Sequence, residues 1–202
     1  MRSLRHSWAE LLPEDLGLGE RLLGRWAAPH RHFHGLQHLA DCLDALAQLG
    51  STARAETLAI WFHDSVHHNR PGVDERASAA SARGELTASG LPASEVSEVE
   101  RLVLITIDHA PLDFDGPGAR ISDADLSVLG AESDRYRESV AQLRAEFAEL
   151  SSRQWRDQRR ARVAMLLAAT PLFHTELGQQ LWADKAMANL HAELRELEAD
   201  GR

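Results

Sequence analysis

The chain of 202 residues has almost no cysteine and no long apolar segment, so it depends on a packed core and not on disulfides or a membrane anchor. It contains one cysteine, Cys42, so no disulfide can form within the chain, and a reducing compartment is expected. No apolar run approaches the roughly 18 to 20 residues that a membrane-spanning helix needs. The first sixteen residues also lack the apolar stretch of a signal peptide. These absences predict a cytoplasmic protein without a membrane anchor.

Positive charge is also scarce. The sequence has 22 lysines and arginines against 31 aspartates and glutamates, which gives a formal net charge of −9. Such a surface disfavours binding to DNA or RNA, because that binding depends on neutralising phosphates. A small phosphorylated substrate remains compatible with the charge, because a bound metal ion can reverse the field inside a pocket. Nucleic acid is therefore not an expected partner, whereas a small phosphorylated molecule is.

Signals for β-strands are missing as well. Aromatic residues make up only 5% of the chain, and no stretch alternates apolar and polar residues or carries an Asn-Gly or Asp-Gly turn. The length suits one domain. The sequence predicts an all-α, single-domain helical bundle. Its helices are expected at residues 3–12, 14–27, 34–49, 52–67, 74–89, 92–109, 123–129, 131–150, 152–169 and 174–199.

One predicted helix stands out by its composition. The stretch ETLAIWFHD within residues 52–67 is apolar on nearly all sides, which predicts a buried central helix. The segment LVLITI at residues 102–107 would suit a strand in isolation, but helical spacing leads into it without a break. We therefore expect helix there.

Histidines and carboxylates occur together in five short groups, at residues 32–38, 62–68, 108–110, 123–127 and 173–176. On a helix, His34 and His38 would share one face, and His63 and His67 would repeat that relation on the next helix. The group at residues 173–176 is interpreted as structural.

Two pairs of neighbouring residues restrict how a site could be built. His63 and Asp64 differ by about 100° around a helix, so both reach one ion only if it lies between their directions. Asp123 and Asp125 would point nearly opposite ways on a helix. At most one of these two should bind a metal, and the other should cap a helix or face solvent.

A ligand set of histidines and aspartates without thiolate suits Mn²⁺, Fe²⁺, Co²⁺, Ni²⁺, Zn²⁺ or Mg²⁺. Structural zinc sites normally recruit cysteines. An open, catalytic site for a divalent cation is therefore expected, with a second cation as an option.

The order of these motifs resembles the HD superfamily of metal-dependent phosphohydrolases, and in particular its small bacterial members. The likeness extends from about Arg31 to Leu194 and rests on RHFHGLQHL, WFHDSV, DERAS, DADLSVLG and ANLHAEL. It implies a helical HD-type domain with its motif core at about residues 31–130 and C-terminal helices at residues 131–200. It also implies four metal ligands, His38, His63, Asp64 and Asp125.

A more distant likeness is to the cyclic-nucleotide phosphodiesterases. Their Tyr-His-Asn-x-x-His-Ala-x-Asp-Val pattern is similar to residues 33–42, although Gly35 replaces the asparagine and Cys42 the valine. This comparison implies that His34 is the acid that protonates the leaving group. Their Ala-Asp-Leu-Ser pattern matches residues 124–127 and selects Asp125 over Asp123 as the metal ligand.

Further candidates surround these positions. Glu75 could position the attacking water, and Arg31 could bind phosphate oxygens through its guanidinium group. His67 and His109 could hold a second metal or the substrate phosphate. The loop at residues 110–120, rich in proline and glycine, is a candidate lid over the site.

Together these features predict an enzyme, a hydrolase that cleaves a phosphoester of a nucleotide or another small phosphorylated metabolite with a metal-activated water. Two alternatives remain open at this stage. One is a regulatory module that binds metal and nucleotide without turnover. The other is a di-iron oxygenase on the same scaffold, with His67 and His109 supplying additional ligands.

Overall fold

The computed structural model describes residues 3–199, and within this range every regular element is a helix. Residues 1–2 and 200–202, which the single-domain prediction includes, lie outside the described residues. The elements are α1 Leu4–Leu11, α2 Leu16–Trp26, α3 Leu36–Gln48, α4 Arg54–Phe62, α5 Asp74–Ala88, α6 Ala93–Ile105, α7 Gly116–Leu126, the 3-10 helix η1 Ser127–Gly130, α8 Ser133–Glu146, α9 Ser152–Ala168, α10 Glu176–Gly178, the π-helical turn η2 Gln179–Ala183 and α11 Asp184–Ala199. The expected all-α fold class is confirmed.

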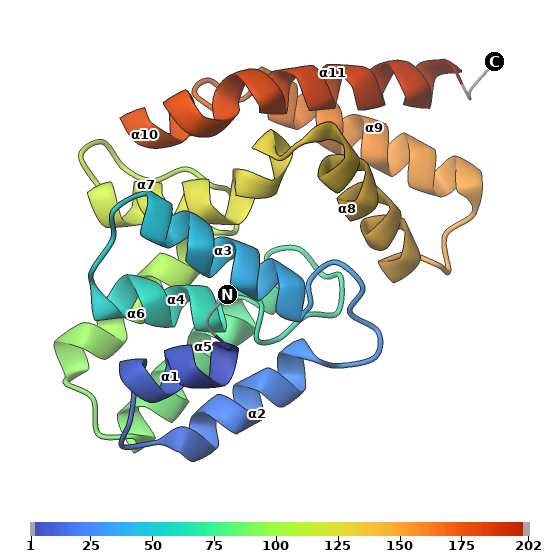
Figure 1. The fold of residues 1–202 in the computed structure, drawn as a ribbon. Coiled ribbons are helices and arrows are strands. Elements are labelled where there is room, and N and C mark those ends of the chain that lie inside the picture. Colours follow the sequence, from blue (N-terminus) through green and yellow to red (C-terminus); the bar gives the residue numbers. More distant parts are fainter. Residues whose placement is uncertain (1–2, 200–202) are drawn as a thin grey trace.

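Helix α4 is the centre of the core. It packs against α1, α3, α5, α6 and α7, which surround it in Figure 1. Its residues from Leu58 to Phe62 have no exposed surface, so the prediction of a buried central helix is confirmed. Two tryptophans fix its position: Trp26 donates a hydrogen bond through Nε1 to the carbonyl of Trp61, and Trp8 packs edge-on against the Trp61 ring. Both tryptophans therefore hold the end of α4 within the core.

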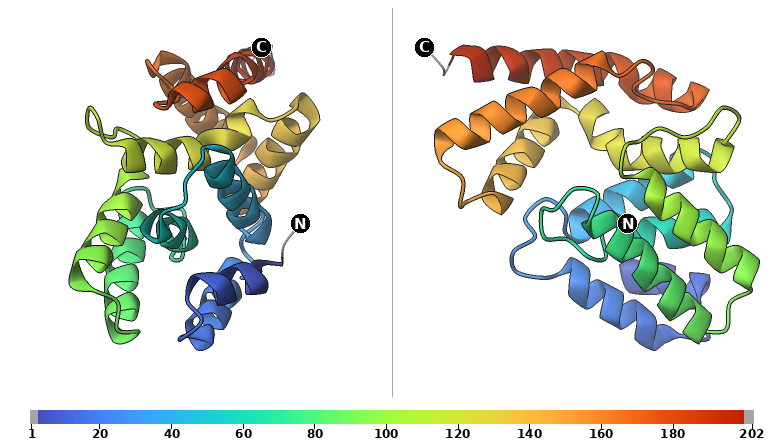
Figure 2. Two further views of the ribbon diagram at one scale, coloured as in Figure 1. Left: turned by 60° about the vertical axis from the view of Figure 1, so that its left-hand side comes forward. Right: turned by 180° about the vertical axis from the view of Figure 1, so that it is seen from behind.

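The C-terminal helices form a second layer. Helix α8 leads away from η1, α9 returns beside it, and α11 lies along α9 across the top of the molecule (Figures 1 and 2). A buried ion pair joins this layer, because Arg159 of α9 donates hydrogen bonds to Glu193 of α11. Tyr136 of α8 donates to the same carboxylate. The three helices therefore hold one another in place.

The turn that follows α7 is fixed by α11. Asn189 donates hydrogen bonds from Nδ2 to the carbonyls of Leu129 and Ala131. A Cβ atom at Gly130 would lie 2.4 Å from the Cβ of Trp182, so only glycine allows this approach. The sequence segments DADLSVLG and ANLHAEL thus meet in space, and their contact positions the end of α7.

The helix boundaries differ from the predicted ones at three places that concern the site. Helix α3 begins at Leu36 instead of residue 34, and α4 ends at Phe62 instead of residue 67. Helix α7 begins at Gly116, within the predicted loop, because Asp115 caps it and Pro117 occupies its first turn. The segment at residues 102–107 is helical up to Ile105, where α6 ends instead of at the predicted residue 109.

Between residues 3 and 199, no helix combines the length and the apolar character that crossing a bilayer requires.

Candidate metal centre

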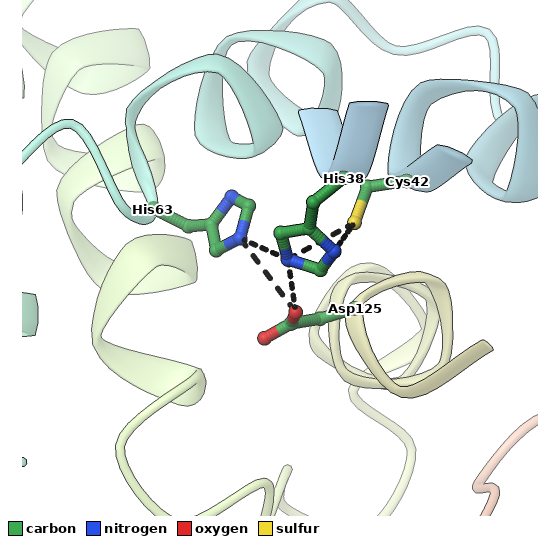
Figure 3. A group of neighbouring side chains, drawn as sticks. All are labelled: His38, Cys42, His63 and Asp125. Carbon is green, nitrogen blue, oxygen red and sulfur yellow. Dashed lines mark hydrogen bonds and ion pairs between the residues drawn. The ribbon is translucent and has the colours of Figure 1, made fainter. Parts of the chain in front are cut away.

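Four of the predicted site residues bring donor atoms to one point. His38 extends from α3, His63 and Asp64 follow α4 directly, and Asp125 lies near the end of α7. Nε2 of His38 lies 3.1 Å from Oδ1 of Asp125 and 3.3 Å from Nε2 of His63. Oδ2 of Asp64 lies 3.3 Å from Nε2 of His63 and 3.9 Å from Nε2 of His38. Figure 3 shows the convergence of His38, His63 and Asp125.

These separations fit a single divalent cation. Metal bonds of about 2.1 Å place neighbouring ligand atoms about 3 to 3.5 Å apart in tetrahedral or octahedral geometry. Among the described residues, the ion pairs of Asp64 and Asp125 are formed with histidines alone, and no lysine or arginine lies within ion-pair distance of either carboxylate. Two imidazoles and two carboxylates at these separations could hold a divalent cation.

The electrostatics of the metal-free centre support this interpretation. Burial disfavours the charged form of His63, yet Asp64 and Asp125 raise the pKa of its ring to about 9. Burial opposes ionisation of the two carboxylates, but the facing histidines, chiefly His63, hold the pKa of both below the usual range. A proton on His63 thus balances part of the charge that a divalent cation would balance in full.

The orientation of His63 is set by its second ring nitrogen. Nδ1 lies 2.8 Å from the carbonyl oxygen of Ile60 and donates a hydrogen bond to it. This contact directs Nε2 to the centre and leaves its lone pair available once the ring is neutral. Trp26 packs against the same ring at 5.3 Å between centroids. His63 therefore reaches the centre in one defined tautomer and position.

Arg31 explains why α4 ends where it does. Its guanidinium donates to the carbonyls of His34, Asp64 and Ser65 and lies 5.4 Å from the ring of Trp26. The carbonyls of Asp64 and Ser65 thus have a hydrogen-bond partner without the further helical turn that would otherwise supply one. Arg31 thus lies behind the centre and does not line the cavity in front of it. The structure gives Arg31 the role of holding the His63–Asp64 turn, instead of the expected role in binding phosphate.

Cys42 lies closer to the centre than the sequence suggested. His38, Cys42, His63 and Asp125 offer donor atoms within 4.8 Å of one another, and Figure 3 shows the thiol beside His38. Its Sγ is 3.6 Å from both ring nitrogens of His38, so it faces the ring and not the lone pair of Nε2. Burial raises the pKa of the Cys42 thiol well above its ordinary value. Cys42 and Asp64 are therefore both candidates for the fourth ligand, and Oδ2 of Asp64 lies 3.3 Å from Nε2 of His63.

A second cluster adjoins the first. Glu146, at the end of α8, accepts hydrogen bonds from the backbone nitrogens of Phe33 and His34 and from Nδ1 of His34, the last at 2.6 Å. The ring of His67 stacks on that of His34 with 4.0 Å between centroids, and its Nε2 lies 3.6 Å from Glu146. His34, His67 and Glu146 form a group that could also hold a metal ion.

The helical relations expected for these histidines are wrong. His34 precedes the first turn of α3 and His67 follows the end of α4, so neither shares a helix face with its expected partner. The two meet each other instead, because Glu146 binds both of them. Capture of the Asp64 and Ser65 carbonyls by Arg31 ends α4 and allows the chain to turn toward Glu146.

The charge states of this cluster differ between its two rings. Burial lowers the pKa of His34, which keeps its ring neutral with Nδ1–H on Glu146. Burial opposes protonation of His67 as well, but Glu146 and Asp64 raise the pKa of that ring. A neutral His34 presents Nε2 as a proton acceptor, whereas the role implied by resemblance required a proton donor. His67 is the better proton donor of the two.

The remaining predicted residues lie around the two carboxylates. Nε2 of His109 is 3.8 Å from Oδ2 of Asp125, and Nδ1 of His67 is 4.0 Å from Oδ1 of Asp64. His109 adopts a positive φ of 54°. The outer oxygen of each carboxylate thus lies near a further histidine, His67 beside Asp64 and His109 beside Asp125.

The centre opens into a cavity of about 380 Å³. Asp64 and Asp125 line it, whereas His38 and His63 are buried behind them. Glu75 lines the same cavity, and its Oε2 is buried without a hydrogen-bond partner among the described residues. A cation held by the four ligands would therefore face the cavity on its carboxylate side, with Glu75 available to a bound water or substrate.

The expectation for Asp123 is wrong. Asp123 neither faces solvent nor caps α7; it is fully buried and accepts hydrogen bonds from the backbone nitrogens of His174 and Thr175. It therefore anchors the segment before α10.

The loop at residues 110–120 contributes no residue to the cavity lining, and Phe114 is fully exposed. That this loop acts as a lid stays a prediction.

Sequence reasoning missed Glu146 and the cavity residues of α8 and α9. Glu146 carries no local signal, because it lies in an ordinary amphipathic helix more than a hundred residues from His34. Buried carboxylates are rare unless they are paired, so its burial is the informative property, and only the tertiary structure reveals that. Comparison with known proteins adds nothing further: the chain matches no protein-family model, no curated protein and no solved structure.

Proposed function

We propose that this protein is a metal-dependent phosphohydrolase that cleaves the phosphoester of a small phosphorylated metabolite. The observation that carries the proposal is the convergence of two histidines and two aspartates at the head of a cavity. A structural metal site would be closed, whereas a catalytic site keeps a position open for water or substrate. The resemblance of the ordered motifs to the HD superfamily supports the same chemistry.

His38, His63, Asp64 and Asp125 would hold the cation. When bound, a divalent cation supplies Lewis acidity, which lowers the pKa of a coordinated water toward neutrality and offsets charge on phosphate oxygens. Imidazole and carboxylate ligands suit Mn²⁺, Fe²⁺, Co²⁺, Ni²⁺ or Zn²⁺, and Mg²⁺ is the remaining option. One cation accounts for the four ligands, and His67 and His109 are placed for a second.

The residues around the four metal ligands would carry out the proton transfers of the hydrolysis. His34, held in one tautomer by Glu146, accepts a proton through Nε2. His67, whose protonated form Glu146 favours, is positioned to give a proton to the departing oxygen. Glu75 orients a water through its unpartnered Oε2. Each of these side chains lines the cavity, so all can reach a substrate there.

One specific observation favours a second candidate function. The outer oxygens of Asp64 and Asp125 each face a further histidine, which is the ligand arrangement that a di-iron oxygenase would use. Oxygen consumption by iron-loaded protein, measured with the same substrates, distinguishes this candidate from hydrolysis.

The test is metal analysis of the purified protein together with a phosphate-release screen. The substrates are nucleoside monophosphates, sugar phosphates and simple phosphodiesters, each with Mn²⁺, Co²⁺ or Mg²⁺. We expect turnover that disappears when His63→Ala and Asp64→Ala are combined, while the exposed Asp113→Asn variant stays active. A protein that binds metal without turnover would support a regulatory module instead. A protein that binds no metal at all would overturn the proposal.

A further inference from the structure

The cavity extends from the metal centre to the C-terminal helices α8 and α9. Histidines and carboxylates line it at the metal centre, whereas apolar residues and arginines line it along α8 and α9. Helix α8 turns Tyr136, Ser139 and Leu143 toward it, which are spaced so that they share one helix face. Helix α9 contributes residues of one face as well, namely Trp155, Gln158, Arg159, Arg162 and Leu166. These helices follow the segment that carries the metal-binding motifs, so this part of the cavity is formed by residues that the motifs do not include.

Several apolar side chains in this part of the cavity do not belong to the core. Leu143, Phe147 and Trp155 are half-buried and are not among the side chains packed against the hydrophobic core of the described chain. The rings of Phe147 and Trp155 lie 5.7 Å apart at an interplanar angle of 39°. Apolar surface that is partly exposed inside a concave site is typical of a ligand contact. The Arg144 guanidinium lies 5.6 Å from the centre of the Trp155 ring, and the aromatic surface that remains exposed favours a planar partner.

Arg162 supplies positive charge to the cavity that the two aromatic rings and the metal ligands Asp64 and Asp125 also line. Arg159, one turn earlier, is fully engaged with Glu193, but within residues 3–199 Arg162 forms no ion pair or hydrogen bond. Burial and the nearby charge of Arg159 lower the pKa of the Arg162 guanidinium, whereas the carboxylates of Asp125 and Glu75 raise it. Its charge also contributes to lowering the pKa of His109. Arg162 is exposed and lines the same cavity as Asp64 and Asp125, so its guanidinium is available to an anion held there.

The size of the cavity limits what it can take. A volume of about 380 Å³ is at the lower end of the range for small-molecule sites, which is about 300 to 1,000 Å³. One phosphoryl group and one ring system fit this space, whereas a polymer does not.

We propose that the α8–α9 side of the cavity binds the organic part of the substrate, a planar aromatic or heteroaromatic group, while Arg162 binds the phosphoryl oxygens. This inference rests on the proposed function, because it takes the phosphoester to lie at the metal centre. It makes Trp155, Phe147 and Arg162 the residues that determine substrate class. Gln158, which also lines this side, can contact the polar edge of a ring.

Binding measurements on the metal-free protein test the inference without requiring turnover. The probes are 1-naphthyl phosphate, which has a planar ring, and glycerol 3-phosphate, which has none, each titrated by calorimetry. Aromatic stacking predicts that the naphthyl ester binds about tenfold more tightly. Trp155→Ala removes this preference, and Trp155→Phe keeps it. Arg162→Ala weakens the binding of both probes by about tenfold.

Two residues of α9 provide matched controls. Arg160 and Met165 are exposed and do not line the cavity, so Arg160→Ala and Met165→Ala should bind both probes as the unmodified protein does. Equal affinity for the two probes, or no binding of either one, overturns the inference. So does a preference that survives in Trp155→Ala. Hydrolysis of glycerol 3-phosphate with unchanged affinity in every variant would leave the proposed function standing and reject this inference alone.

Discussion

Oε2 of Glu146 lies 2.6 Å from Nδ1 of His34, although 112 residues separate the two positions. The other carboxylate oxygen accepts hydrogen bonds from the backbone nitrogens of Phe33 and His34. The hydrogen bond to Nδ1 determines which tautomer His34 adopts and which nitrogen it presents to the cavity. A helix from the second layer thereby orients a histidine that borders the metal centre in the first.

This relationship predicts the effect of Glu146→Gln. The amide oxygen can still accept from the two backbone nitrogens, but the amide group would face Nδ1 of His34 with a donor and favour the wrong tautomer. We expect turnover to fall by about 100-fold with metal content unchanged, as when other orienting partners are removed. The pair acts as a unit, so His34→Ala combined with Glu146→Gln should be no slower than His34→Ala alone. Additive losses would show that the two residues act separately.

Removing one carboxylate tests the ligand set. Asp125→Asn leaves the size of the side chain unchanged but removes half of the negative charge that the cation would balance. We expect the bound metal, measured by elemental analysis after dialysis, to fall below one tenth of an equivalent. Asp113→Asn, in the exposed loop, removes the same charge away from the centre and should retain the metal. Equal metal content in both variants would contradict the assignment.

Cys42 and Asp64 compete for the position of fourth ligand, and truncation separates them. Because Sγ faces the ring of His38 instead of the ligand lone pair, Cys42→Ala should change metal affinity by less than about threefold. It should cost about 1 kcal/mol of stability, since a buried atom is lost. Asp64→Ala should weaken binding by about 100-fold or more. A reversed order of the two effects would make the thiolate the ligand.

Metal affinity should depend steeply on pH. In the metal-free protein the pKa of His63 is raised to about 9 from 6.5, so below pH 9 the ring carries a proton that the cation must displace. The association constant should therefore increase about tenfold per pH unit between pH 6.5 and 8.5 and level off above pH 9. Calorimetry at pH 7.5 in two buffers of different ionisation enthalpy should find about one proton released per cation. Affinity that is flat over this range would show that His63 is neutral without metal.

Arg31→Lys tests the support behind the centre. A lysine can replace one of the three carbonyl contacts of the guanidinium, and the buried carbonyls of Asp64 and Ser65 would compete for it. We expect a loss of about 2 kcal/mol of stability and a melting temperature lower by about 5 °C. Arg153→Lys on the exposed part of α9 should leave the melting temperature unchanged. A phosphate-binding role alone would weaken substrate binding and leave stability intact.

Much of the fold follows from the sequence by itself. Helical periodicity, proline and glycine breaks and the absence of strand signals suffice to predict an all-α chain, and the apolar stretch ending at Phe62 is enough to identify the central helix. These features are local, because each depends on residues within a few turns of one another. The candidate metal ligands are also accessible from sequence, since His38, the His63–Asp64 pair and Asp125 occur in short, ordered motifs.

Only the tertiary structure decided what surrounds those ligands. Arg31 ends α4 by binding carbonyls of the following turn, so helical spacing could not predict the neighbours of His67. Glu146 reaches His34 from another layer, and Arg162 of α9 lines the same cavity as Asp64 and Asp125. The physical reason is common to all three: hydrogen bonds and ion pairs between distant segments depend on how the helices pack, and the local pattern of a helix does not encode its partner.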